Sequence, residues 1–330
     1  MIERFRKNNF LVIGRAGLDL YADPPGTKIE DAIKFSAALG GSAANIAVAI
    51  AKQGGKAALL TAVSNDAVGR YTMKALASYG VDTRFITTVG GEARNSLAVV
   101  ETRADNCQSV IYRNDAADFQ VREANVGAID VSGFAAVIVT GTSLAREPSR
   151  SATFKAMHIA RASGLPLIID IDYRPYSWTS TAEAQVVCSK AADMCDIVVA
   201  NDDEFAVLAG SQTGLSHAEQ LALQPGRIVV YKMGEKGCST FANSNRFDTP
   251  IFKVSALKPT GAGDGFMGGF ISGLVAGASL PEAVRRGAAT AAIVVTRVGC
   301  ASAMPNATEV LTFIGQALTC EKANHAYPTT

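Results

Sequence analysis

The stretch TGAGDG, residues 260–265, places three glycines and one carboxylate at the start of an apolar helical pattern. The first turn of a helix has free backbone N–H groups and the positive end of the helix dipole. Small residues there let an anion touch the backbone, so Gly261, Ala262 and Gly263 could form an anion hole. In phosphoryl transfer a carboxylate takes the proton from the attacking hydroxyl. Asp264 could be that base, and its place at a helix N-terminus predicts a lowered pKa.

The same stretch has a purely structural interpretation. Its glycines could only permit tight helix packing, and Asp264 could be the N-terminal cap of the helix. However, the three small residues before Asp264 clear a phosphate-sized space that a cap does not need. This space favours the chemical interpretation.

Short apolar runs alternate with helical patterns along most of the chain. Such a pattern predicts a mostly parallel sheet with helices on both faces, which is a doubly wound α/β fold. The runs span residues 10–13, 57–63, 135–140, 166–172, 196–200 and 227–231. Between Phe85 and Val121 only turns separate the apolar runs, which predicts an antiparallel meander. We therefore expect one α/β unit over residues 1–330, with a small β-sheet lid from about 15–35 and 85–121.

Composition excludes several classes of protein. With 31 basic and 30 acidic residues the net charge is +1, so we expect neither nucleic acid nor a membrane surface as a partner. The N-terminal apolar run is too short for a signal peptide, and the two longest uncharged runs are shorter than a membrane span. The six cysteines include no C-x-x-C pair, so we expect reduced thiols in a cytoplasm.

Common nucleotide and nucleophile motifs are absent. The Gly55-Lys56 pair has Ile50 where a P-loop needs its first glycine, and a dinucleotide fingerprint at 261–266 fails at Phe266. No G-x-S-x-G is present, and none of the three histidines has a metal-ligand spacing. A P-loop, a dinucleotide-binding enzyme, a hydrolase triad and a zinc site are all disfavoured.

Two longer segments carry a family resemblance. GGSAANIAVAIAKQG (40–54) and TGAGDGFMGGF (260–270) are similar to the two signatures of the PfkB/ribokinase family of carbohydrate kinases. The resemblance covers essentially the whole chain and implies a ribokinase-like fold. It implies that Gly40, Gly41 and Asn45 bind the sugar, that Asp19 in the β1 loop grips sugar hydroxyls, and that Asp264 is the base. Asp19 could instead be an ordinary turn carboxylate, and Asn45 could simply cap a helix.

The nucleotide side resembles the same family. Asn201-Asp202-Asp203-Glu204 is similar to its N-x-x-E motif, in which the Glu helps to hold Mg²⁺ and its water shell. Lys232, Gly234 and Gly237 resemble the turn that borders the nucleotide. The resemblance thus implies ATP and Mg²⁺ as cofactors. Glu204 could instead be a first-turn acid, and Lys232 could be a surface side chain.

The segments 12–21, 112–118, 170–178, 231–237, 257–264 and 294–305 resemble one branch of this family. Members of that branch phosphorylate a keto-deoxy sugar acid at its terminal hydroxyl. Arginine makes planar, bidentate contacts with carboxylates, so Arg15, Arg113 and Arg174 are the candidates for binding the acid group. Arg174 could instead pair with Asp170 and Asp172. A kinase for 2-keto-3-deoxygluconate, fructose or ribose, or a non-catalytic sugar or nucleotide sensor on this fold, stays open.

One departure from the family concerns a metal site. The second signature of the family usually opens D-T-x-G-A-G-D, and its first Asp helps to form a monovalent-cation site. Here Lys258 and Pro259 replace the Asp and the Thr, which puts potassium activation in doubt. The lid strands also suggest a homodimer formed by sheet contacts, although one chain could cover them itself.

Overall fold

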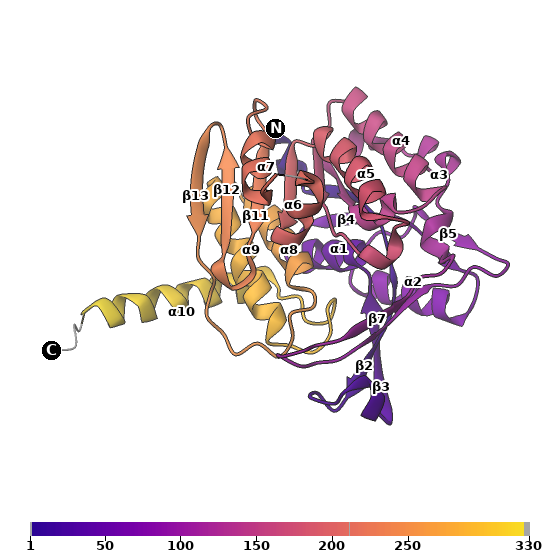
Figure 1. Ribbon diagram of the computed structural model, residues 1–330, viewed down its shortest axis with the longest axis horizontal. Coiled ribbons are helices and arrows are strands. Elements are labelled where there is room, and N and C mark those ends of the chain that lie inside the picture. Colours follow the sequence, from indigo (N-terminus) through magenta and orange to yellow (C-terminus); the bar gives the residue numbers. More distant parts are fainter. Residues whose placement is uncertain (1, 211, 327–330) are drawn as a thin grey trace.

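The computed structural model describes residues 2–210 and 212–326, and its centre is a nine-stranded sheet (Figure 1). The strand order is β13-β12-β11-β10-β9-β8-β1-β4-β5; the β11–β12 and β12–β13 pairings are antiparallel, and all the others are parallel. The strands are β1 (Asn9–Ile13), β4 (Lys56–Ser64), β5 (Ile86–Val89), β8 (Ala136–Thr140), β9 (Leu167–Asp170), β10 (Ile197–Asn201), β11 (Ile228–Lys232), β12 (Cys238–Ala242) and β13 (Asn245–Thr249). All six predicted strands lie in this sheet, so the predicted mostly parallel α/β fold is confirmed.

Helices cover both faces of the sheet. One face carries α1 (Ser42–Lys52), α2 (Ala67–Ser78), α8 (Ala262–Val275) and α9 (Leu280–Val295). The other carries α3 (Glu123–Gly127), α4 (Ser149–Ala162), α5 (Thr181–Asp193), α6 (Asp202–Ala209) and α7 (Gly214–Leu221). α10 (Ala307–Ala326) packs on α9 through Val310 and then extends away from the body (Figure 1). Within the described residues, no helix combines the length and the apolar character that crossing a membrane requires.

Strand β1 shows why both faces need cover. Leu11 and Ile13 point to one hydrophobic core, and Phe10 and Val12 point to the other. All four side chains are almost completely buried. Residues two apart on a strand share a face, so a continuous apolar run requires a layer of helices on each side.

A separate four-stranded sheet projects from the body (Figure 1). Its order is β3-β2-β6-β7, formed by β2 (Gly17–Asp23), β3 (Lys34–Gly40), β6 (Ser96–Val100) and β7 (Ser109–Tyr112). We call it the small sheet. Two sequence predictions about it were wrong in detail. Strand β5 pairs with β4 in the large sheet, because α2 connects them as a parallel crossover, and β2 pairs with β6 in parallel instead of in a meander.

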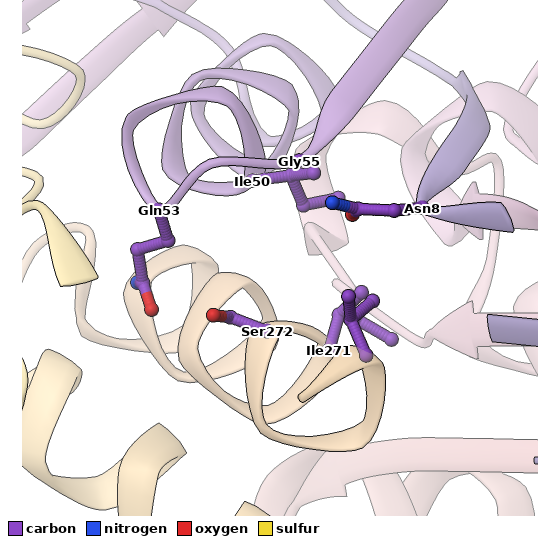
Figure 2. A pocket seen from close by; sticks show the side chains of 7 residues that line it. Asn8, Ile50, Gln53, Gly55, Ile271 and Ser272 are labelled. Carbon is purple, nitrogen blue, oxygen red and sulfur yellow. The ribbon is translucent and has the colours of Figure 1, made fainter. Parts of the chain in front are cut away.

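Helix α8 lies very close to its neighbours because of its glycines. A Cβ atom on Gly268 would collide with Ala49 of α1, and one on Gly273 would collide with Ala283 of α9. Figure 2 shows the last turn of α1, with Gln53, across from Ile271 and Ser272 of α8. The cavity between them measures about 10 Å³, which is room for at most one water molecule. The packing role predicted for these glycines therefore coexists with the candidate chemistry at the start of α8.

Five of the six cysteines, at 107, 188, 195, 238 and 300, are free thiols, as predicted. The side chain of Cys320 lies outside the described part of the chain.

Candidate active site

The candidate residues gather at the carboxyl edge of the large sheet. Arg15 follows β1, Arg174 follows β9, and Asn201 and Lys232 end β10 and β11. The chain leaves β1 toward β4 on one side and later returns to β8 on the other, so strand order reverses between β1 and β8. Ligands of open α/β sheets bind at such a switch point. Helices α1 and α8 begin beside this edge (Figure 1).

Asp264 lies in the first turn of α8, and its carboxylate is bound by a residue from the other signature. The amide Nδ2 of Asn45, on α1, donates a 2.8 Å hydrogen bond to Oδ2 of Asp264. The amide oxygen of Asn45 is buried and has no partner among the described residues. The two sequence signatures thus meet at one carboxylate, and a second polar atom of Asn45 is left for a ligand.

The predicted lowering of the pKa of Asp264 was wrong. Burial raises its pKa to about 7, and the negative charge of Asp172 adds to the increase. The hydrogen bond from Asn45 acts in the opposite direction but is weaker. Loss of hydration outweighs the helix dipole here, because folding has removed the carboxylate from water.

The candidate anion-hole residues leave the backbone open at the start of α8. Gly261 is the N-terminal cap of α8 with φ of +84°, and a Cβ there would lie 2.9 Å from Sγ of Cys300. Only glycine adopts this left-handed conformation without strain, and its missing side chain leaves the backbone open. The ammonium of Lys232 lies 3.3 Å from the position that a Cβ of Gly263 would take. A cation therefore stands beside the start of the helix, where the N–H of Ala262 donates to the carbonyl of Pro259 at 3.4 Å.

Asp19 is the most enclosed candidate on the sugar side. It lies on β2, is 4% exposed, and its Oδ2 accepts a 3.2 Å hydrogen bond from the hydroxyl of Tyr21. Its Oδ1 has no partner among the described residues, and burial raises its pKa. A side chain at Gly40 would collide with this carboxylate, and one at Gly41 would collide with the carbonyl of Arg15. Because Gly40 and Gly41 have no side chains, one side of the Asp19 carboxylate is left uncovered.

The three arginines differ in how free their guanidinium groups are. Arg15 is buried and donates to Oγ of Ser96 at 3.0 Å. Arg113 is also buried; it pairs with Asp118, donates to the carbonyl of Thr142 and stacks on a phenylalanine ring. These contacts use most of its donors, so Arg113 offers charge more than free N–H groups.

Arg174 keeps part of its guanidinium open. It pairs with Oδ1 of Asp172 at 2.8 Å, which matches the alternative considered from the sequence, yet its side chain is 45% exposed. The charge of Asp172 raises the pKa of Arg174. Arg174 is thus a fixed cation whose remaining N–H groups face solvent.

Asn201 and Glu204 form the start of α6. The side chain of each accepts a hydrogen bond from the backbone N–H of the other, at 2.8 and 2.7 Å, which is a capping box. Glu204 also accepts a bond from the backbone of Tyr173 at 3.2 Å. Burial raises the pKa of Glu204 to about 7, whereas the nearby Lys232 lowers it. The structural alternative for Glu204 is therefore real, but its buried carboxylate still stands beside the anion hole.

Lys232 is not the surface side chain that the sequence left open. Its Nζ lies 3.8 Å from Oδ1 of Asp170, and its side chain is 17% exposed. Burial lowers the pKa of Lys232, but the surrounding acids, Asp170 first, raise it by more. Gly234 and Gly237 lie beyond it in the turn between β11 and β12.

The residues present fit a magnesium ion that is held mainly by water and phosphate. Among residues 2–210 and 212–326, no three or more His, Cys, Asp or Glu side chains form a cage for a metal ion. Mg²⁺ commonly keeps several waters and uses one or two carboxylates together with substrate phosphates. Glu204 and Asp170 are buried carboxylates of that kind.

Sequence reasoning assigned no site role to Asp170 and Asp172. Asp172 has φ of +38°, and its Oδ2 is buried without a partner among the described residues. Asp170 and Asp172 both raise the pKa of Asp264. Their place directly after an apolar strand, at the carboxyl edge of a parallel sheet, was the available signal.

Comparison with known proteins identifies the class of protein. Residues 7–307 match the pfkB family carbohydrate kinases. The chain belongs to this family, and it is a phosphotransferase that acts on a sugar.

Curated relatives identify the branch. The chain is 37% identical over 319 residues to 5-dehydro-2-deoxygluconokinase of Photobacterium profundum, covering 95% of this chain and 96% of the relative. It is 34% identical over 307 residues to the 5-dehydro-2-deoxygluconokinase of Bacillus subtilis, covering 92% and 94%. The resemblance predicted from the sequence motifs is thus confirmed.

Solved structures confirm the ribokinase-like fold. A double mutant of fructokinase from Vibrio cholerae, with fructose, ADP and potassium ion bound, has a TM-score of 0.82 and 26% identity, covering 92% of this chain and 97% of that chain. A fructokinase from Xylella fastidiosa with bound ATP has a TM-score of 0.83 and 24% identity, covering 94% and 99%.

Proposed function

We propose that this kinase transfers the terminal phosphoryl group of ATP to the 6-hydroxyl of 5-dehydro-2-deoxy-D-gluconate, giving the 6-phosphate. The names of its relatives support this substrate. The observation that carries the proposal is the half-open guanidinium of Arg174 at the site edge, because a sugar acid brings a carboxylate that a neutral sugar lacks.

Asp264 is the base in this proposal. Asn45 fixes its carboxylate, and a pKa of about 7 makes it a better proton acceptor than an ordinary aspartate. Above that pKa it is ionised and takes the proton of the 6-hydroxyl. The backbone N–H groups of Gly261 and Gly263, with the ammonium of Lys232 beside them, stabilise the charge on the transferring phosphoryl.

ATP and Mg²⁺ are the expected cofactors. Bound ATP supplies the phosphoryl group, and Mg²⁺ neutralises charge on its phosphates. Asn201, Lys232, Gly234 and Gly237 would border the nucleotide, and Glu204 would hold the metal through water. Their place at the ends of β10 and β11 supports this role.

The remaining candidates would hold the sugar acid. Asp19 and Asn45 each have a buried oxygen without a partner among the described residues, and both oxygens are acceptors for sugar hydroxyls. The backbone at Gly40 and Gly41 would approach the sugar directly. Arg15 and Arg174 would bind the carboxylate, and the paired Arg113 would add positive charge behind them. The small sheet, which carries Asp19, would act as the lid.

Two further proposals concern the assembly and the location. We infer a homodimer through the small sheet, because its projecting strands expose large apolar side chains on and beside β3 and β7. These are Ile33, Phe35, Val110 and Tyr112. We also expect the protein in the cytoplasm, in keeping with its free thiols.

A substrate panel tests the proposed reaction. ATP consumption with Mg²⁺ is measured on 5-dehydro-2-deoxygluconate, 2-keto-3-deoxygluconate, fructose, ribose and a nucleoside. We expect the first to be preferred, and we expect Arg174→Ala to raise its KM at least about 10-fold while leaving any activity on fructose unchanged.

Arg161→Ala is the matched control, because Arg161 is similarly exposed and pairs with Asp196 away from the site. Preference for a neutral sugar would overturn the sugar-acid assignment but leave the assignment of kinase activity intact. If the protein bound a sugar but phosphorylated none of the panel, the result would favour the non-catalytic sensor.

A further inference from the structure

Lys258 is buried in an unusual way. Its side chain is 0% exposed, although lysines are almost never fully buried without a charged partner. Among the residues that the structure describes, no carboxylate oxygen lies within 4.0 Å of its ammonium. The acceptor that the ammonium has is the backbone carbonyl oxygen of Thr260. A desolvated cation held by a backbone carbonyl resembles a coordinated monovalent metal ion.

The loop that carries Lys258 leads directly into the anion hole. The backbone N–H groups of Leu257 and Lys258 donate to the carbonyl of Val295, at the end of α9, at 2.8 and 3.3 Å. Thr260, whose carbonyl the ammonium binds, precedes the cap residue Gly261. Lys258 thus bonds to α9 through its backbone and, through its ammonium, to the start of α8, where the phosphoryl group would be stabilised.

The positive charge of Lys258 interacts with carboxylates on both the sugar side and the base side of the site. It lowers the pKa of Asp19, although burial of that carboxylate has the larger and opposite effect. Burial lowers the pKa of Lys258 itself, while the nearby acid Asp264 acts to raise it. One internal cation therefore lies between the residues proposed for the sugar and for the base.

A potassium ion does not fit beside this lysine. The family resemblance implies that an Asp at the position of Lys258 would help to form a monovalent-cation site, and a fructokinase double mutant of Vibrio cholerae was solved with potassium ion bound. Here that ligand is missing, and the ammonium already binds the carbonyl of Thr260. A potassium ion beside the Lys258 ammonium would put two positive charges close together in a dry interior, where they repel strongly.

We propose that the ammonium of Lys258 is a built-in monovalent cation that orders the anion-hole loop, so that this kinase works without added potassium. The proposal rests on the kinase activity and not on which sugar is phosphorylated. Lys258 acts through the loop and is a positioning residue.

The first test compares turnover in potassium chloride and in choline chloride at equal ionic strength. We expect wild-type kcat to differ by less than about twofold between the salts, since no ion enters the site. Lys258→Met keeps the apolar stem but not the charge, and we expect its kcat to fall about 100-fold with little change in the KM for the sugar. Lys258→Asp restores the family residue, and its kcat should rise with potassium but not with choline.

A second readout needs no substrate. We expect potassium to leave the melting temperature of the wild type unchanged and to raise that of Lys258→Asp, because only the variant binds the ion. This measurement of melting temperature tests the proposal even if the protein phosphorylates no sugar of the panel. Lys52→Met is the matched control, since Lys52 also binds carbonyls, those of Ser302 and Met304 at 3.2 and 2.6 Å, but outside the anion hole. It should gain no response to potassium.

Three results would overturn the proposal. The first is a wild type activated more than about fivefold by potassium, and the second is a wild type whose melting temperature potassium raises. The third is a Lys258→Met variant whose kcat stays within about threefold of the wild type in choline chloride. If Lys258→Asp does not fold, the wild type and Lys258→Met still decide.

Discussion

Asp264 has a stability cost that follows from its chemistry. A carboxyl group whose pKa is raised by folding binds a proton more tightly in the folded chain than in the unfolded one. Stability is therefore lost as pH rises from the unfolded pKa, near 4, to the folded pKa of about 7. The same burial that makes Asp264 a better base thus makes the folded protein less stable at neutral pH.

The Asp264→Asn variant separates the two effects. We expect kcat to fall roughly 100- to 10,000-fold with a KM close to that of the wild type, because the base is lost and the shape is kept. We expect its melting temperature to exceed that of the wild type at pH 8 by more than at pH 5, because the neutral amide has no charge to desolvate. Steady-state kinetics and thermal unfolding at the two pH values check both parts.

Asp66 provides the control for the pH dependence. It is the N-terminal cap of α2, and the backbone N–H of Gly69 lowers its pKa. A lowered carboxyl pKa contributes stability that is lost only as pH falls below the pKa of the unfolded chain. Asp66→Asn should therefore lower the free energy of unfolding by the same amount at pH 5 and at pH 8. Retained turnover in Asp264→Asn would contradict the assignment of the base.

At the scale of single elements, the start of α8 depends on one backbone conformation. Gly261→Ala places a Cβ at φ of +84° and against Cys300. We expect it to destabilise the protein by more than about 1 kcal/mol and to lower kcat about 100-fold, because the N–H groups of the anion hole shift. Denaturant unfolding and kinetics measure the two effects.

Gly277, at the other end of the same helix, is the matched control. Its φ is +73°, and a Cβ there would meet nothing within 4 Å. Gly277→Ala should share the backbone strain but keep kcat within about twofold of the wild type. Equal loss of kcat in both variants would mean that helix stability, and not the anion hole, is what matters.

Local patterns predicted the elements well, and contacts distant in sequence explain what they missed. The apolar runs identified six strands of the large sheet, and the two signatures identified Asn45 and Asp264, because each is encoded by neighbouring residues. The direction of the pKa shift of Asp264 depends on its burial and on Asp172, which lies in the loop after β9. The burial of Lys258 could not be predicted either, since it depends on α9 and the loop after it.

At the scale of the whole molecule, the small sheet is the part least supported by the rest of the chain. It projects from the body (Figure 1), and residues 33–37 of its edge are exposed on both faces. A sheet with large exposed apolar side chains is stabilised by a partner. The sheet also carries Asp19, so a second copy of the chain would help to position a sugar-binding residue.

We therefore predict that the protein sediments as a homodimer and that Phe35→Glu with Tyr112→Glu makes it a monomer. Desolvating two carboxylates at an apolar contact costs more than such a contact gains. The monomer should show a raised KM for the sugar acid and an unchanged KM for ATP, because the nucleotide residues lie on β10 and β11 of the large sheet. Val186→Glu, which changes an exposed valine on α5, should stay dimeric. A wild-type monomer would refute the dimer, and a monomeric variant with unchanged kinetics would show that the small sheet holds Asp19 without a partner.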